Sequence, residues 1–222
     1  MISTLSYGAQ LTGTDARTPA SGPLGLEDVL GSEAWQRLPR TVRERFSHAA
    51  APLEYAGMFD VVSASRLGKL FAWAARRFGT PIAPRTGENV AAMVRVSPVP
   101  GGTAWDRCYR WGDGTETWVR SIKMIDAGHR LVERLAAHLC MPLHVFEQDG
   151  ALHFRSTDYC LEFFPFRGRA LQLALPRWLS PGITHVEHRD LGGGWFRFTL
   201  RVEHPRWGQL YFQTGRFRAA GD

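Results

Sequence analysis

The chain has 222 residues, of which 44% are hydrophobic and 12% aromatic, enough to close a hydrophobic core of ordinary size. This composition excludes intrinsic disorder and fibrous repeats for most of the chain. The net charge is +6, from 27 Lys and Arg against 21 Asp and Glu, but the basic residues are spread along the chain and only Lys69 and Lys123 are lysines. Nucleic-acid binding needs basic residues gathered on one face, so we expect a solvated basic surface and no nucleic-acid partner.

No apolar run approaches the roughly 18 residues that a membrane-spanning helix needs, and the first residues lack the basic and apolar regions of a signal peptide. We therefore expect a cytoplasmic protein with no membrane span. Cys108, Cys140 and Cys160 are an odd number at wide spacing, without a CxxC motif or a Cys/His cluster. This spacing favours reduced core thiols over a zinc site or a disulfide framework.

Residues 1–25 are small and polar, a composition that cannot bury enough area to order itself. The sequence therefore predicts a flexible leader over 1–25 and a single domain over 26–222. Within the domain, Pro39 suits a first helical turn, and Leu38, Val42 and Phe46 recur at helical spacing. Short helices are expected between about residues 26 and 48.

A clearer helix follows, because Ser63 or Ser65 can cap its start and Gly79 with Pro81 can end it. Its apolar positions recur at helical spacing, so we expect them to form one stripe that packs on a sheet. The stripe consists of Leu67, Leu70, Phe71, Ala74 and Phe78.

From Asn89 onward, runs rich in Val, Phe, Tyr, Trp and Thr are separated by Gly and Pro turns, a pattern typical of strands joined by hairpins. Residues 169–179 also favour a strand, with a short helix left open. The other predicted strands are roughly 90–99, 103–111, 116–125, 130–138, 143–148, 152–163, 183–190, 195–203 and 209–218.

About ten antiparallel strands would curl, because closure or strong bending protects the sheet edges. The alternation is clearest where Phe196, Phe198, Leu200 and Val202 share one strand face. The sequence therefore predicts an α+β fold: a curled antiparallel β-meander, barrel-like or strongly bent, whose N-terminal helices cover an open end or side.

Familiar catalytic and nucleotide-binding motifs are missing: the chain has no GxGxxG, GxxxxGK[ST], GxSxG or HExxH sequence. A catalytic triad built from distant residues stays open. His185 and His188 are three residues apart on a predicted strand and so point to opposite faces, which prevents chelation. We expect no metal and no cofactor.

Charged residues share predicted strand faces with apolar ones. Arg107 shares a face with Trp105 and Tyr109, Arg120 with Trp118 and Ile122, and Glu133 with Leu131 and Leu135. Because a charge among apolar neighbours must be paired or solvated, these groups meet in a wet cavity or form salt bridges outside the sheet. The candidate ligand-binding residues are Trp105, Arg107, Tyr109, Arg120, Glu133 and Glu187.

Several segments in this order resemble a bacterial family known as domain of unknown function 4166. The segments are LPRTVRERF at 38–46, WDRCYRW at 105–111, LVER at 131–134, LPRWLSPG at 175–182, HVEH at 185–188 and the run 195–217. Members of that family often follow a saccharopine-dehydrogenase-like or short-chain-reductase NAD(P)-binding domain. This chain carries no such domain, so the resemblance implies an accessory module and transfers no oxidoreductase activity. Among the matching positions, only Arg107, Glu133 and Glu187 have side chains able to do more than support the scaffold.

Three functions are expected from these features, and whether the protein is an enzyme stays open. The first is non-catalytic binding of an apolar or amphipathic small molecule in a β-sheet cavity, with Arg107 or Arg120 orienting an anionic group. The second is a protein-interaction module that docks on an NAD(P)-dependent reductase or self-associates through Trp195, Trp207 and Tyr211. The third is an enzyme that uses Glu133 and Glu187 as an acid/base pair.

Overall fold

Alternating side chains and hairpin turns shape the β-rich part of the protein, as seen in a computed structural model. The structure describes residues 25–47, 51–75, 82–126, 129–135, 138–166, 169–176 and 179–221. The predicted flexible leader, except for its last residue, lies outside this described part.

Short helices precede the sheet, as the Pro39 signal and the helical spacing predicted. They are α1 (Leu26–Leu30), α2 (Ser32–Arg37) and α3 (Arg40–Phe46), and α4 (Arg66–Ala75) follows the first strand. The strands are β1 (Leu53–Ala64), β2 (Gly87–Val99), β3 (Gly102–Arg110), β4 (Glu116–Ile125), β5 (Leu131–Arg134), β6 (Leu139–Gln148), β7 (Ala151–Ser156), β8 (Cys160–Phe166), β9 (Arg169–Ala174), β10 (Ile183–Gly192), β11 (Trp195–His204) and β12 (Gly208–Ala219).

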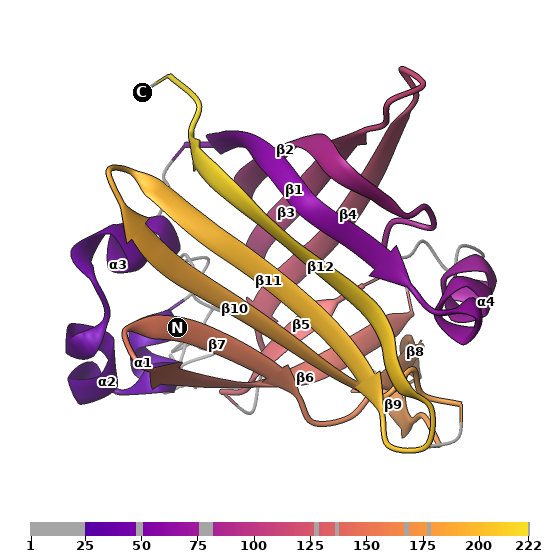
Figure 1. Ribbon diagram of the computed structural model, residues 1–222. Coiled ribbons are helices and arrows are strands. Elements are labelled where there is room, and N and C mark those ends of the chain that lie inside the picture. Colours follow the sequence, from indigo (N-terminus) through magenta and orange to yellow (C-terminus); the bar gives the residue numbers. More distant parts are fainter. Residues whose placement is uncertain are drawn as a thin grey trace, which may run out of the picture.

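Antiparallel strands close into a ten-stranded barrel in the order β5-β4-β3-β2-β1-β12-β11-β10-β7-β6, with β6 pairing back onto β5. The hairpin of β8 and β9 extends from the β6 edge. Helices α1 to α3 lie on one side of the barrel against β6 and β10, and α4 lies at the opposite end (Figure 1). The predicted α+β fold with a curled antiparallel meander is confirmed. Because β5 and β6 pair, the sheet is a closed barrel and not an open, bent sheet.

Strand β1 was not predicted, because its alternation is broken. It pairs with β2 and β12, and its register with β12 shifts between Phe59 and Val61. The inward positions therefore change from Tyr55 and Phe59 to Val62, three residues further on. A β-bulge of this kind hides the period of two in the sequence.

The prediction of reduced thiols is wrong for two of the three cysteines. Cys140 on β6 and Cys160 on β8 are paired in register and form a disulfide, whereas Cys108 is free and buried. The sequence hid this pair because residues 152–163 read as one strand. The structure instead ends β7 at Ser156 and begins β8 at Cys160.

Helix α4 begins at a predicted cap, but the side of the helix that packs on the barrel is not the predicted one. The Gly68 amide donates to Ser65 Oγ over 3.0 Å, which makes Ser65 the cap, and a Cβ at Gly68 would overlap the Leu210 carbonyl oxygen. This close contact turns Gly68 and Phe71 toward the barrel and leaves Leu67 and Leu70 exposed. The predicted stripe is therefore wrong for these two leucines. The Ala74 side chain and Phe78 lie outside the described part.

Candidate functional site

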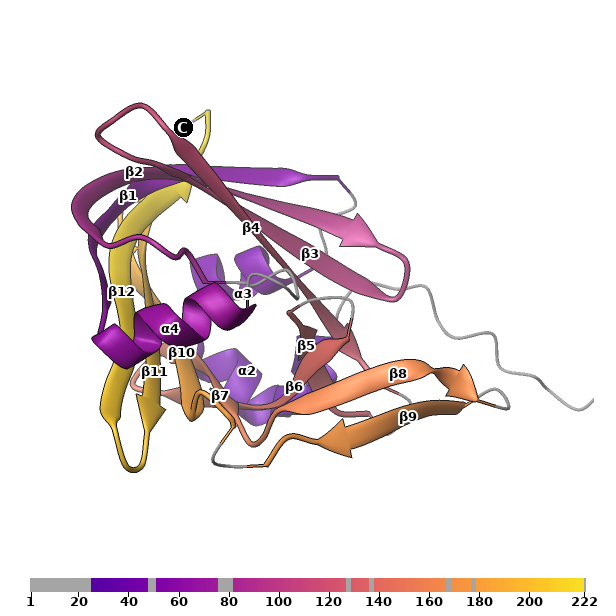
Figure 2. The ribbon, with the colours of Figure 1, turned by 90° about the vertical axis from the view of Figure 1, so that its right-hand side faces the viewer.

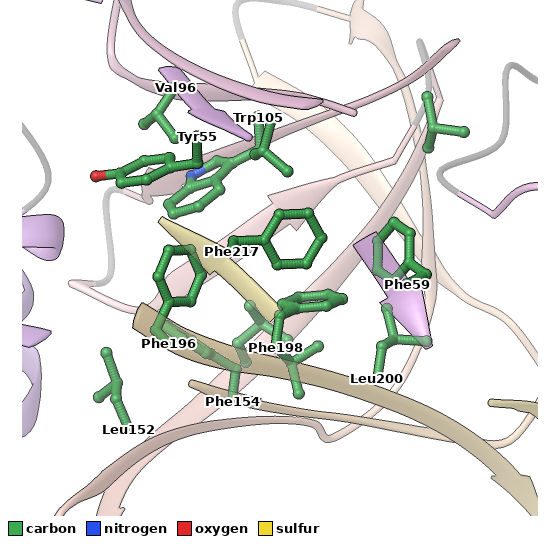
Figure 3. Packing of buried hydrophobic residues seen from close by; sticks show 14 of the residues in the cluster. Tyr55, Phe59, Val96, Trp105, Leu152, Phe154, Phe196, Phe198, Leu200 and Phe217 are labelled. Carbon is green, nitrogen blue, oxygen red and sulfur yellow. The ribbon is translucent and has the colours of Figure 1, made fainter. Parts of the chain in front are cut away.

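The barrel encloses a cavity of about 370 Å³, within the range of small-molecule sites. Its wall is mostly aromatic and aliphatic, because β11 places Phe196, Phe198, Leu200 and Val202 inward at a period of two. Strands β10 and β12 add Val186, Leu210 and Phe217. Figure 3 shows Phe196 and Phe198 of β11 near Phe217 of β12 and Phe59 of β1, with Trp105 of β3 pointing into the same interior. Figure 2 looks toward the end of the barrel that α4 covers.

Two of the predicted residues on β3 line the cavity and a third supports it from behind. Trp105 and Arg107 are on the cavity wall. Tyr109 is fully buried, stacks on Phe59 with ring centroids 4.9 Å apart, and donates its hydroxyl hydrogen to Gln213 Oε1 over 3.0 Å. Tyr109 thus holds the wall in place without lining the cavity.

Glu133 also lines the cavity and pairs there with a lysine that the sequence reasoning missed. Lys123 on β4 lies opposite Glu133 on β5, and its Nζ is 2.9 Å from Glu133 Oε1, with both side chains buried. Burial pushes the pKa of Glu133 upward, but Lys123 and Arg107 outweigh it and hold that pKa below its ordinary value. For Lys123, burial lowers the pKa, and the nearby Glu133 opposes this effect without cancelling it.

Lys123 was overlooked because Trp118 and Ile122 suggested the wrong face of β4 as the interior. Trp118 is 55% exposed, whereas Val119, Ser121 and Lys123 are buried. The sequence did contain a signal, because Val119, Ser121 and Lys123 recur at every second position of the strand. Lys123 is one of only two lysines in the chain. A bulky aromatic residue on a strand therefore marks the interior less reliably than the complete alternation does.

Arg107 is hydrogen-bonded to a serine hydroxyl and not to a carboxylate of the described residues. Its Nη2 donates to Ser121 Oγ over 2.7 Å, and within the described residues its buried Nε has no hydrogen-bond partner and it joins no salt bridge. Arg107, Lys123 and Glu133 together leave one positive charge at the wall of an apolar cavity. Such a charge favours an anionic group brought in by a ligand, because an unpaired buried charge is costly.

The prediction that Arg120 and Glu187 join this cavity is wrong. Arg120 is 58% exposed on the outer face, with its Nε 3.6 Å from Asp106 Oδ1. Glu187 lies on the outer face of β10, where its Oε1 accepts from Arg189 Nε over 2.6 Å. Successive residues of β4 point to opposite faces, so Arg120 points out of the barrel while Lys123 points into it. Glu133 and Glu187 therefore lie on opposite faces of the barrel wall and cannot serve as an acid/base pair in one pocket.

The predicted interaction surface does not form as one patch. Tyr211 is buried and lines the cavity, whereas Trp195 and Trp207 are exposed at the start and beyond the end of β11. The two tryptophans therefore lie near opposite ends of the ten-residue strand β11. Within the described ranges, no group of three metal-ligating side chains is close enough to hold a metal ion.

His188 is a buried histidine at the cavity wall that sequence reasoning treated only as a poor metal ligand. Its ring lies 4.8 Å from that of Phe46 and 5.2 Å from that of Phe198, and its buried Nδ1 has no hydrogen-bond partner in the described structure. Burial, reinforced by nearby Arg45 and Lys123, lowers the pKa of His188 well below its ordinary value. The imidazole is therefore neutral at pH 7.

This neutral histidine predicts a pH-dependent stability. Below pH 6.5 the unfolded chain takes up a proton at His188 that the folded protein does not, so the free energy of unfolding falls as the pH falls. One such proton gives a slope of about 1.4 kcal/mol per pH unit. Urea unfolding between about pH 7 and pH 5 should show a shallower slope for His188→Phe than for wild type. His144→Phe, which replaces an exposed histidine of β6, is the matched control. Equal slopes in both variants would contradict this assignment.

A family model described as Domain of unknown function (DUF4166) matches residues 38–217, which include the whole barrel wall except the last residues of β12. No curated protein and no solved structure is significantly similar to the chain. In the part of the chain that the structure describes, no helix has the length and apolar character that a membrane crossing requires.

Proposed function

The chain belongs to the family of the domain of unknown function DUF4166, and we propose that its barrel binds an amphipathic small molecule without catalysing a reaction. The ligand is an apolar chain or ring system that ends in an anionic group, such as a carboxylate. The observation that carries this proposal is Arg107, a buried guanidinium at the wall of an apolar cavity that has a serine hydroxyl as its partner but, among the described residues, no carboxylate.

The charge of the cavity supports an anionic head group. Glu133 neutralises Lys123 at 2.9 Å, which leaves Arg107 as the excess positive charge. A ligand carboxylate could accept from the Nε of Arg107, which is buried and without a partner in the described structure. Charge-assisted hydrogen bonds of this type are about twice as strong as neutral ones, and Arg suits a carboxylate geometrically.

The residues of the cavity wall indicate that the rest of the ligand is apolar. Apart from the polar cluster, the residues around the cavity are mainly aromatic and aliphatic, among them Phe59, Phe198, Leu200 and Phe217. Burial of apolar ligand surface against them contributes roughly 25 cal/mol per Å². An anion without an apolar part would not gain this free energy of burial, so the site favours amphipathic anions over small inorganic ones.

Native mass spectrometry of the protein as purified tests the proposal. We expect a fraction of the protein to carry one small molecule that, after extraction into organic solvent, is detected as an anion with an extended apolar part. Arg107→Met should lose this molecule, whereas Arg120→Met, which changes an outer-face arginine, should retain it. Recovery of a cationic or highly polar molecule from the wild-type protein would contradict the proposal.

A further inference from the structure

Helix α4 turns an apolar surface away from the barrel. Phe71 and Ala72 line the cavity, whereas Leu70 and Trp73 are exposed by 57% and 62%. Leu67 is exposed on the same helix. The helix therefore has apolar residues on two sides, and only one of these sides packs against the protein.

A tryptophan of the neighbouring hairpin turn adds to the exposed apolar residues around α4, at the edge of the helix where Phe71 lies. Trp207, between β11 and β12, is exposed, and its ring centroid lies 5.9 Å from that of Phe71. We call Leu67, Leu70, Trp73 and Trp207 the α4 surface. It lies at the end of the barrel opposite α1 to α3 (Figure 1). Exposed apolar residues grouped in this way mark an interaction site more often than isolated ones do.

Cations lie beside the α4 surface, and helix α4 itself carries no acidic residue. Arg66 and Lys69 are exposed on α4, and Arg206 is exposed in the turn that holds Trp207. The sequence has no Asp or Glu between Asp60 and Glu88, or between Glu203 and Asp222. The α4 surface thus combines aromatic and aliphatic residues with three neighbouring cations, and the acid nearest to it in the sequence is Glu203, four residues before Trp207.

We propose that the α4 surface binds to the surface of an anionic lipid bilayer. Leu70 and Trp73 enter the head-group region, and Arg66 and Lys69 lie near the lipid phosphates. Leu and Trp beside basic residues suit this interface, because Trp prefers the head-group level and anionic lipids attract Lys and Arg. A protein partner would need a complementary acidic surface, and a second copy of the chain would place like charges together.

This contact would place the cavity beside the bilayer, because Gly68, Phe71 and Ala72 on the opposite side of α4 line the cavity. Transfer of an amphipathic ligand between bilayer and barrel rests on the function proposed above. The membrane contact itself does not, so it is measured on vesicles without any added ligand.

Co-sedimentation with two kinds of vesicle tests the proposal. The wild-type protein should bind vesicles that contain roughly one third phosphatidylglycerol in phosphatidylcholine much more strongly than phosphatidylcholine alone. Arg66→Gln/Lys69→Gln should weaken this binding about 25-fold, since each of the two cations near an anionic surface contributes about a factor of five. Leu70→Gln/Trp73→Gln should weaken it at least about tenfold.

Leu191→Gln/Trp195→Gln is the matched control, because it removes an exposed Leu and an exposed Trp from the β10–β11 hairpin, on the other side of the barrel from α4 (Figure 1). This variant should bind vesicles like the wild type. Circular dichroism confirms that each variant is folded. Equal binding by the α4 and control variants, or no preference for phosphatidylglycerol, would overturn the proposal. A dimer in light scattering that Leu70→Gln/Trp73→Gln abolishes would also overturn it, in favour of a second copy on this surface.

Discussion

Replacing Glu133 by Leu should lower the free energy of unfolding by about 3–5 kcal/mol, because it leaves Lys123 charged, buried and without its partner. Arg107 adds to the effect, since its positive charge also acts on Glu133 and is nearly excluded from water. Urea unfolding at pH 7, followed by tryptophan fluorescence, measures the change.

The double variant Lys123→Met/Glu133→Leu is the control. Because it removes both charges and fills the space with apolar groups, it should recover most of the stability that Glu133→Leu loses. The remaining loss comes from Arg107, which lacks the nearby Glu133 charge in both variants. Equal destabilisation by the single and the double variant would mean that lost packing, and not an unpaired charge, explains the result.

Replacing Arg107 by Met should weaken the binding of a long-chain carboxylate such as dodecanoate between about 10- and 100-fold, because a hydrogen bond to a charged group contributes about 1.5–3 kcal/mol. The same substitution removes an incompletely paired charge from the cavity wall, so the unliganded protein should be as stable as the wild type or more so. Displacement of a fluorescent fatty-acid analogue measures the affinity.

Arg120→Met is the matched control for this prediction, because Arg120 lies one residue from Ser121 but on the outer face. It should leave dodecanoate binding unchanged. If both arginine variants bind equally weakly, the loss comes from the net charge of the protein and not from a head-group contact in the cavity.

Local patterns predicted most of the barrel. Strict alternation from Phe196 to Val202, and Gly and Pro turns at the hairpins, place β10, β11 and β12 close to their observed bounds. Ser65 was among the two predicted caps of α4. These features depend on residues near one another in the sequence, where a single pattern fixes both the element and its face.

The remainder depends on contacts between distant residues. The bulge in β1 breaks the alternation, and the pairing of β6 with β5 and with β8 closes the barrel and joins Cys140 to Cys160. Similarly, the contact of Gly68 with the Leu210 backbone decides which side of α4 faces inward. None of these contacts has a local sequence signal.

Only part of the candidate site could be predicted, because its geometry also depends on contacts between distant residues. Trp105, Arg107 and Glu133 line the cavity as expected, whereas Arg120 and Glu187 point outward. Whether a charged strand residue points in or out depends on the face that its strand presents after closure. On β4 the exposed Trp118 suggested the wrong face and concealed Lys123.

Isothermal titration calorimetry of the wild-type protein with dodecanoate and with dodecanol tests most directly whether the cavity binds an amphipathic anion. The two molecules share an apolar chain and differ at the head group. We predict one dodecanoate per chain, bound at least about tenfold more tightly than dodecanol, since only the carboxylate can pair with Arg107. Equal affinities, or no binding of either molecule, would contradict the assignment of the cavity and of Arg107.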